Sequence, residues 1–211
     1  MLDVITADHI DAELPWPFAI DVLRTGFLAG DSVTTPQRHH HSMGTDDDSP
    51  TLLLMPSWSD QYAGVKLVTV FPATSTTDLG AACAAADIVT CATMSSTPVV
   101  SGGSLNVGCH LDLVGAFTPA MRETDDVAIR RARVFVDTMA GALTEAGDIL
   151  QPIQSGALIE SDIEADFFSL CRGFEVQRAD DDITLFKSVG HALEDLVSAA
   201  AVYEALRQPP A

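Results

Sequence analysis

Short, nearly all-apolar segments recur in the second half of the chain, and they constrain the fold more than any other feature. They are residues 87–93 (DIVTCAT), 109–116 (CHLDLVGA), 133–137 (RVFVD) and 183–187 (ITLFK). Such segments are typical of strands in a parallel sheet that is buried on both faces. Helical patterns lie between them, for example at 139–147 and 161–171, and an amphipathic helix over 193–206 closes the chain. The alternation predicts an α/β fold with a parallel sheet.

The first 72 residues have a different pattern. Apolar residues recur at helical spacing from Phe18 to Leu28, and Gly30 ends that run. A polar connection over 31–50 follows, and strand-like patterns then appear at 51–55 and 65–71. This part therefore predicts helices plus a β-meander, which is an α+β arrangement. We expect two domains, which are residues 1–72 and residues 73–211, the second including the closing helix.

Charge and cysteine usage exclude several classes of function. The chain carries 11 basic and 30 acidic side chains, for a net charge of −19. A surface so acidic repels phosphate backbones and anionic lipid, so we expect neither nucleic acid nor a membrane as partner. The first ten residues lack the basic start of a signal peptide, and no apolar run is long enough to span a membrane. Four widely spaced cysteines without a C-x-x-C pair predict free thiols in a cytoplasmic protein.

Lys66 is one of only two lysines, and it sits in an otherwise apolar strand pattern (GVKLVTVFP). A cation there is costly unless it is paired or functional. Strand alternation places Lys66 on the same face as Val68. Two interpretations remain open: an edge-strand lysine that extends to water, or a proton donor or acceptor in a cleft.

Two other motifs have candidate binding chemistry. Arg38 precedes three histidines, so the arginine is a candidate clamp for a carboxylate and the histidines are candidate metal ligands. Adjacent histidines in a loop rarely chelate one ion, so we expect no metal site. The glycines Gly102, Gly103 and Gly108 do not have the G-x-G-x-x-G spacing of a dinucleotide-binding turn, and they predict ordinary turns.

Three stretches together resemble the ornithine cyclodeaminase/mu-crystallin family. They are TLLLMPSWSDQYAGVKLVTVFP, GCHLDLVGAFTPAMRETDD and ITLFKSVGHALEDLVSAAAVYEAL, and they occur in the family's order. The resemblance implies an N-terminal oligomerisation and substrate domain, followed by a Rossmann-like NAD(P)-binding domain. It also implies a homodimer that acts on a small amino or imino acid with NAD or NADP as cofactor.

The resemblance also implies roles for individual residues. Lys66 matches the family's active-site lysine, near the substrate nitrogen, and Arg38 resembles the arginine that contacts the substrate carboxylate. The residues that match cofactor-lining loops are Thr93, Met94, Ser95, Val114, Gly115, Lys187, Ser188 and Val189. The implied chemistry is hydride transfer between the carbon that bears the nitrogen and the nicotinamide, with Lys66 as the proton donor or acceptor.

Two departures from the family refine this interpretation. The cyclodeaminases carry an aspartate shortly after the VG pair, whereas this chain has Phe117 near that place and no carboxylate until Glu123. That difference favours an imine reductase, such as a Δ1-pyrroline-2-carboxylate reductase, over ornithine cyclisation. Between Pro72 and Asp78, roughly a hundred residues of the family pattern are missing, about three βα units that include the glycine-rich turn. The alternative is therefore an internally deleted, inactive homologue that only binds or dimerises.

Overall fold

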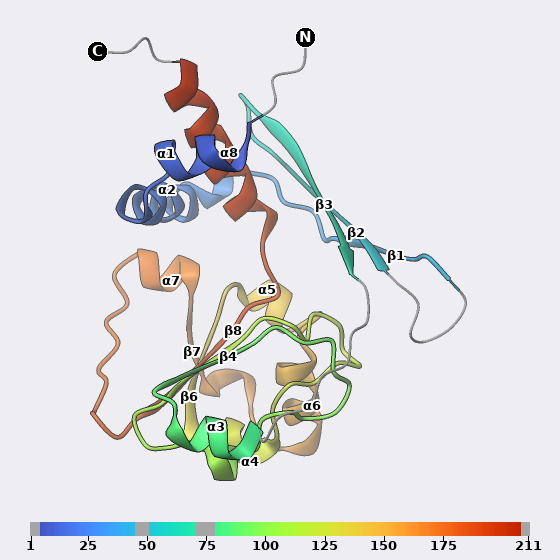
Figure 1. Ribbon diagram of the computed structural model, residues 1–211, viewed down its shortest axis with the longest axis vertical. Helices are drawn as coiled ribbons and strands as arrows, with labels where there is room; N and C mark the ends of the chain where they lie inside the picture. Colours follow the sequence, from blue (N-terminus) through green and yellow to red (C-terminus); the bar gives the residue numbers. More distant parts are fainter. Residues whose placement is uncertain (1–4, 45–50, 71–78, 208–211) are drawn as a thin grey trace. The chain divides into compact units, whose positions relative to one another are not determined.

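The computed structural model describes residues 5–44, 51–70 and 79–207, and its contacts divide the chain into two units. One unit combines residues 1–72 with 191–211, and the other is residues 73–190. The predicted junction after Pro72 lies outside the described residues. Each unit has its own sheet, and Figure 1 shows the two sheets with their helices.

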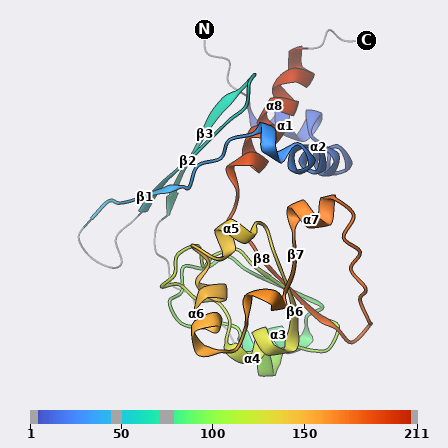
Figure 2. The same cartoon turned by 180° about the vertical axis from the view of Figure 1, so that it is seen from behind.

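The first unit contains a three-stranded antiparallel sheet in the order β1-β2-β3 (Figure 2). Its strands are β1 (His39–Ser42), β2 (Thr51–Trp58) and β3 (Ala63–Val70). Its helices are α1 (Ala7–Glu13), α2 (Trp16–Leu28) and α8 (Ala192–Arg207), with a 3₁₀ turn at Gly30–Ser32. Thr6 begins α1 as its N-cap, because its side chain accepts a hydrogen bond from the His9 amide at 3.4 Å.

Helix α8 packs against α1, α2, β2 and β3. A Cβ atom at Gly26 would lie 2.8 Å from a methyl carbon of Val197, so glycine permits the close approach of α2 and α8. The sequence pattern predicts this closing helix in the second domain, whereas its contacts group it with residues 1–72. The difference has a physical reason, because a helix rich in apolar residues predicts burial and does not specify which element covers it.

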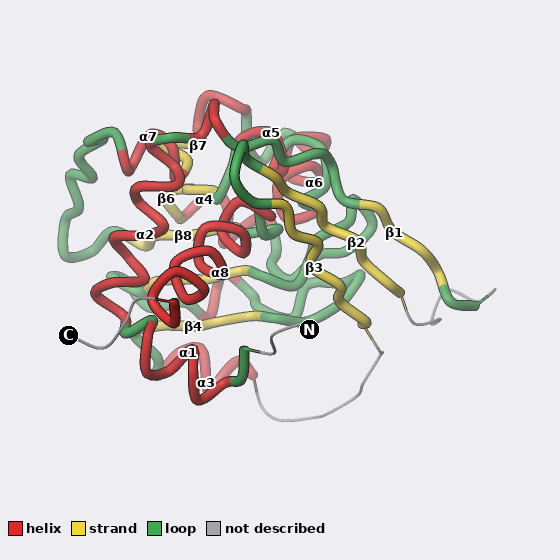
Figure 3. The backbone as a smooth tube through the Cα atoms, turned by 90° about the horizontal axis from the view of Figure 1, so that it is seen from above, coloured by secondary structure: helices red, strands yellow, loops and turns green. Residues whose placement is uncertain are grey.

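The second unit contains a five-stranded parallel sheet in the order β4-β5-β8-β6-β7. Figure 3 labels four of these strands, β4, β8, β6 and β7, in that sequence across the sheet. The strands are β4 (Ile88–Cys91), β5 (His110–Leu113), β6 (Ala132–Val136), β7 (Ile163–Asp166) and β8 (Ile183–Lys187). The helices are α3 (Leu79–Ala85), α4 (Asp126–Arg131), α5 (Met139–Ala142), α6 (Gly147–Ser155) and α7 (Phe167–Cys171), with 3₁₀ turns at Gly102–Ser104 and Glu160–Asp162. Leu111, Leu113 and Leu185 are fully buried at its centre. The α/β fold class and its parallel sheet are confirmed.

Several elements differ from the predicted ones. The segment 161–171, predicted as a helix, forms strand β7 and then the short helix α7. Ile163 and Ala165 are buried on either side of the more exposed Glu164 and pair with β6, so tertiary pairing outweighs local helical preference. The polar histidine run, predicted as a connection, forms β1 because the backbone of β2 offers it a hydrogen-bonding edge.

Candidate active site

The carboxyl ends of β4 and β5 are joined by one buried carboxylate, that of Glu123. One of its oxygens accepts hydrogen bonds from the Thr93 amide at 2.5 Å and the Thr93 hydroxyl at 2.8 Å. The other oxygen accepts from the amides of Gly115 at 2.8 Å and Ala116 at 3.3 Å. Glu123 is completely buried, so these donors replace the water that an ionised carboxylate would otherwise require.

Gly115 is required by this close packing of strand ends. A Cβ atom at this position would lie 1.8 Å from the carbonyl oxygen of Thr93 and 2.3 Å from a Glu123 carboxylate oxygen. No side chain fits in that space. Gly115, for which the family resemblance implies a place in the cofactor-lining loops, therefore has a packing role between the ends of β4 and β5.

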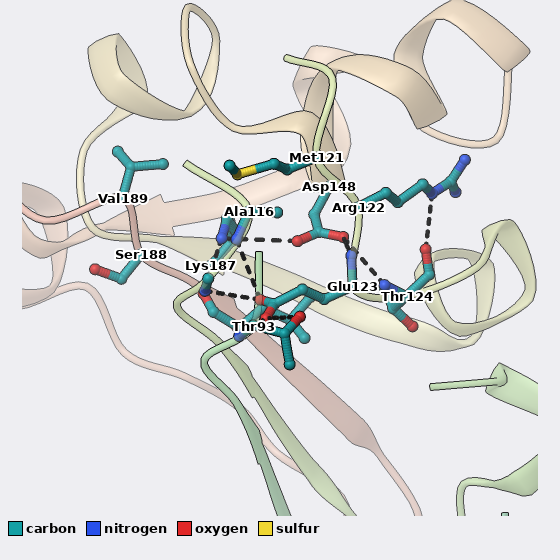
Figure 4. Close-up of polar contacts among 12 residues, drawn as sticks. Thr93, Ala116, Met121, Arg122, Glu123, Thr124, Asp148, Lys187, Ser188 and Val189 are labelled. Carbon is teal, nitrogen blue, oxygen red and sulfur yellow. Dashed lines mark hydrogen bonds and ion pairs between the residues drawn. The ribbon is translucent and has the colours of Figure 1, made fainter. Parts of the chain in front are cut away.

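Beneath these loops, Lys187 and Asp148 form a fully buried ion pair, and their side chains point toward one another in Figure 4. The lysine Nζ lies 3.6 Å from Asp148 Oδ2 and donates a hydrogen bond to the Leu113 carbonyl at 3.2 Å. Asp148 Oδ1 accepts from the amides of Glu123 and Thr124 at 2.8 and 3.1 Å. Burial lowers the pKa of Lys187 and raises the pKa of Asp148, and each charge opposes the shift of the other.

Asp137, at the end of β6, organises the loop after β8. Its Oδ2 accepts hydrogen bonds from the Val189 amide at 2.8 Å, the Gly190 amide at 2.7 Å and the Ser188 hydroxyl at 3.1 Å. Its Oδ1 accepts from the Thr138 amide at 2.6 Å. Asp137 is completely buried, so this carboxylate fixes the backbone of residues 188–190.

The predicted cofactor residues all follow or end the adjacent strands β4, β5 and β8. They therefore gather at the carboxyl ends of the strands of the parallel sheet. Ligands of open α/β sheets bind beyond these carboxyl ends. Thr93 and Val114 are exposed there, and Met94, Ser95 and Ser188 are half-buried. Lys187 differs, because its side chain is fully enclosed by protein and its ammonium contacts Leu113 and Asp148.

Sequence reasoning did not assign roles to Glu123, Asp137 or Asp148. One signal was available, since Asp137 ends an apolar strand segment with a carboxylate. Nothing in the local pattern around Asp148 indicates a buried partner for Lys187.

In the first unit, a cavity of about 320 Å³ lies beside Lys66. We call it the Lys66 groove; its lining includes Met55, Ser57, Tyr62, Lys66, Asp195 and Tyr203. The Lys66 ammonium forms an ion pair with Asp195 of α8 at 3.1 Å, and the two side chains are 41% and 40% exposed. Lys66 therefore lies on an edge strand, as one interpretation expected, and also lines a cavity, as the other expected.

The structure does not bring Arg38 into the lining of this groove. Arg38 is half-buried just before β1. His39 and His41 stack on one another with ring centroids 6.4 Å apart, on an exposed strand. Within residues 5–44, 51–70 and 79–207, no group of three His, Cys, Asp or Glu side chains is arranged to hold a metal ion. Nor does any described helix have the length and apolarity to cross a membrane.

Comparison with known proteins decides the family. The sequence profile of the ornithine cyclodeaminase/mu-crystallin family matches residues 73–209. The chain belongs to this family. A Delta(1)-pyrroline-2-carboxylate reductase from Colwellia psychrerythraea is 43% identical over 130 residues, which cover 61% of this chain and 41% of that relative. The ketimine reductase mu-crystallin of Mus musculus is 39% identical over 119 residues, which cover 56% of this chain and 36% of that relative.

Solved structures of the family share the fold. The Thermococcus litoralis Delta(1)-pyrroline-2-carboxylate reductase, in complex with NADH and L-proline, has a TM-score of 0.81 at 19% identity, over 94% of this chain and 95% of that one. The iminosuccinate reductase of Paracoccus denitrificans, in complex with NAD+, has a TM-score of 0.71 at 14% identity, over 95% of each chain. In sequence, the match spans only about two fifths of the curated relatives' length.

Proposed function

We propose that this member of the ornithine cyclodeaminase/mu-crystallin family is an NAD(P)-dependent reductase of small cyclic imino acids. The observation that carries the proposal is the Lys66 groove, where a cation on a largely apolar strand is paired beside a cavity of ligand size. The names of the relatives support the same substrate class, since two of them reduce a carbon–nitrogen double bond.

The strand-end loops of the second unit fit the nicotinamide end of NAD or NADP. The hydroxyls of Thr93, Ser95 and Ser188 donate to Glu123, to the Thr97 carbonyl and to Asp137, so they can meet a ligand only as hydrogen-bond acceptors. Val114 offers an exposed apolar surface. These loops are fixed by Glu123 and Asp137, so their geometry is set before a ligand binds. Gly115, Lys187 and Val189 are buried, and we propose that they act by supporting the loops. When bound, the cofactor supplies the hydride.

In this proposal, side chains of the chain bind the substrate and donate its proton. In this proposal the Lys66 ammonium donates a proton to the imine nitrogen, which makes the adjacent carbon a better hydride acceptor. Lys66 then recovers a proton from solvent, and the product is a cyclic amino acid such as proline. Arg38 is proposed to bind the substrate carboxylate, as the family resemblance implies.

A reductase is favoured over a cyclodeaminase because of the segment after Gly115. Phe117 is partly buried near the position where the cyclodeaminases have an aspartate. The first carboxylate that follows is Glu123, which is buried and whose two oxygens accept hydrogen bonds from three backbone amides and the Thr93 hydroxyl. This chain therefore offers no carboxylate here to act on a cyclic intermediate.

The second candidate is an internally deleted homologue that binds or dimerises without turnover. It is favoured by the absence of a G-x-G-x-x-G turn from the sequence, and by the position of β4 at the edge of its sheet. A Rossmann domain binds the pyrophosphate at such a turn, next to its first strand. A chain that lacks this turn has lost the main contacts to the cofactor's phosphates.

We also propose a cytoplasmic homodimer. Val65 and Leu67 on β3 are 61% and 66% exposed, and such apolar side chains on an edge strand favour pairing with another surface. The four cysteines are free thiols in the structure, in keeping with a reducing compartment.

The test of the proposed function is steady-state oxidation of NADH and NADPH by purified protein with Δ1-pyrroline-2-carboxylate. We expect turnover by the unsubstituted chain and its loss in Lys66→Ala. Arg24→Ala is the matched control, because it removes another exposed cation that is paired with a carboxylate, Asp21. Saturable cofactor binding without turnover would favour the second candidate.

A further inference from the structure

The ion-pair partner of Lys66, Asp195, also lines the Lys66 groove. Asp195 comes from the first turn of α8, and its carboxylate lies 3.1 Å from the Lys66 ammonium within the lining of the same groove. Both side chains are about two fifths exposed, so their charges remain accessible from the groove.

An exposed ion pair of this kind contributes little to the stability of the fold, because water and salt screen the two charges. The fold of the first unit is held instead by buried apolar contacts of α8, among them Leu193 and Val202 at 1% and 2% exposure. The stability of the fold therefore does not account for the position of the Lys66–Asp195 ion pair beside a cavity.

The chemistry of the groove fits a zwitterion. A protonated imino or amino acid carries a positive nitrogen, which the Lys66 ammonium alone would repel. Asp195 supplies the opposite charge at the same place. The lining beyond the pair is mostly apolar, with Met55, Leu196 and Ala199, and it suits the methylene groups of a small ring.

We propose that Asp195 is a further catalytic residue, which binds the positively charged nitrogen of a cyclic imino acid after Lys66 has protonated it. This inference rests on the proposed function. In the proton transfer the N–H bond of Lys66 breaks, a new N–H bond forms on the imine, and the positive charge moves from lysine to substrate. The Asp195 carboxylate pairs with the Lys66 ammonium before the transfer and with the protonated imine nitrogen after it.

The test compares two ligands of similar ring shape, with and without a charged nitrogen. L-proline has the positive nitrogen, and tetrahydrofuran-2-carboxylate has an ether oxygen in its place. Each is titrated calorimetrically into the unsubstituted chain, Asp195→Asn and the control Asp21→Asn, alone and with NADH. Asp21 is also part of an exposed ion pair, with Arg24 at 3.3 Å.

We expect Asp195→Asn to weaken L-proline binding roughly tenfold or more, the loss of one charge-assisted hydrogen bond. Its affinity for tetrahydrofuran-2-carboxylate should change by less than about twofold, and Asp21→Asn should match the unsubstituted chain. Equal effects of Asp195→Asn on both ligands, or no effect on either, would overturn the role of Asp195 and leave the proposed function standing. If the unsubstituted chain binds no L-proline, both proposals fail.

Discussion

The Lys187 ammonium lies 3.6 Å from the Asp148 carboxylate, and both side chains are completely buried at the carboxyl end of the parallel sheet. Through the Asp148 bonds to the amides of Glu123 and Thr124, this pair is linked to the carboxylate that joins β4 and β5. The loops after β4 and β5, which we propose to line the cofactor site, are therefore held in place by buried charged groups.

Removing both members of the buried pair should cost less stability than the sum of the losses from removing each one alone. Lys187→Met leaves Asp148 without its cation, and we expect a loss of about 3–5 kcal/mol in the free energy of unfolding. Asp148→Asn keeps an oxygen for the two amides, so the double variant should lose less than the sum of the single losses. Urea unfolding of the four proteins measures this, and additive losses would contradict it.

The penalty of Lys187→Met should also depend on pH. Burial raises the pKa of Asp148 above its ordinary 3.8, and losing Lys187 removes an interaction that lowers it. A folded pKa above the unfolded value means that the native state binds more protons, so stability falls as pH rises through that window. The loss should therefore be larger at neutral than at mildly acid pH. A penalty independent of pH would contradict the assignment.

Glu123→Gln should destabilise the second unit although it preserves size. An amide NH2 would replace one oxygen that now accepts two hydrogen bonds, and would face N–H donors. We expect a loss of about 3 kcal/mol or more in the free energy of unfolding, because buried donors remain unsatisfied. A thermal melt that matches the unsubstituted protein would show that Glu123 does not join the strand ends.

Gly115→Ala should disturb the same strand ends by steric overlap. Its Cβ would meet backbone at 1.8 Å, so β4 and β5 must separate, at a cost of about 1–3 kcal/mol or more, with weaker NADH binding. Gly103→Ala is the control, since its nearest neighbour would lie at an ordinary 3.6 Å. Equal behaviour of the two variants in unfolding and NADH titration would refute the packing role.

The proposed homodimer should depend on the exposed face of β3. Leu67→Lys places a charge where we expect burial against the second copy, and strand alternation keeps it on the face opposite Lys66. Size-exclusion chromatography with light scattering should show a dimer that this variant dissociates. Val107→Lys, an equally exposed position in the second unit, should remain dimeric. A monomeric unsubstituted chain would contradict the proposal.

The strands of the parallel sheet were predictable because their signal is local. The apolar segments containing Leu111 and Leu185 read as buried strands, and both side chains are fully buried. Strand β7 was missed because Ile163 and Ala165 are too few to show a period, and pairing with β6 decides their conformation. The role of Glu123 was missed because its hydrogen bond to Thr93 spans thirty residues of sequence.

The most direct test of the proposed reductase follows the hydride itself. Purified protein is incubated with Δ1-pyrroline-2-carboxylate and reduced cofactor that carries deuterium at the transferable position of nicotinamide C4, and proline is analysed by mass spectrometry. We predict proline with one deuterium at the α-carbon, absent with Lys66→Ala and retained with Arg24→Ala. No labelled proline from the unsubstituted, cofactor-binding chain would contradict the proposed function and leave the inactive homologue as the account of this protein.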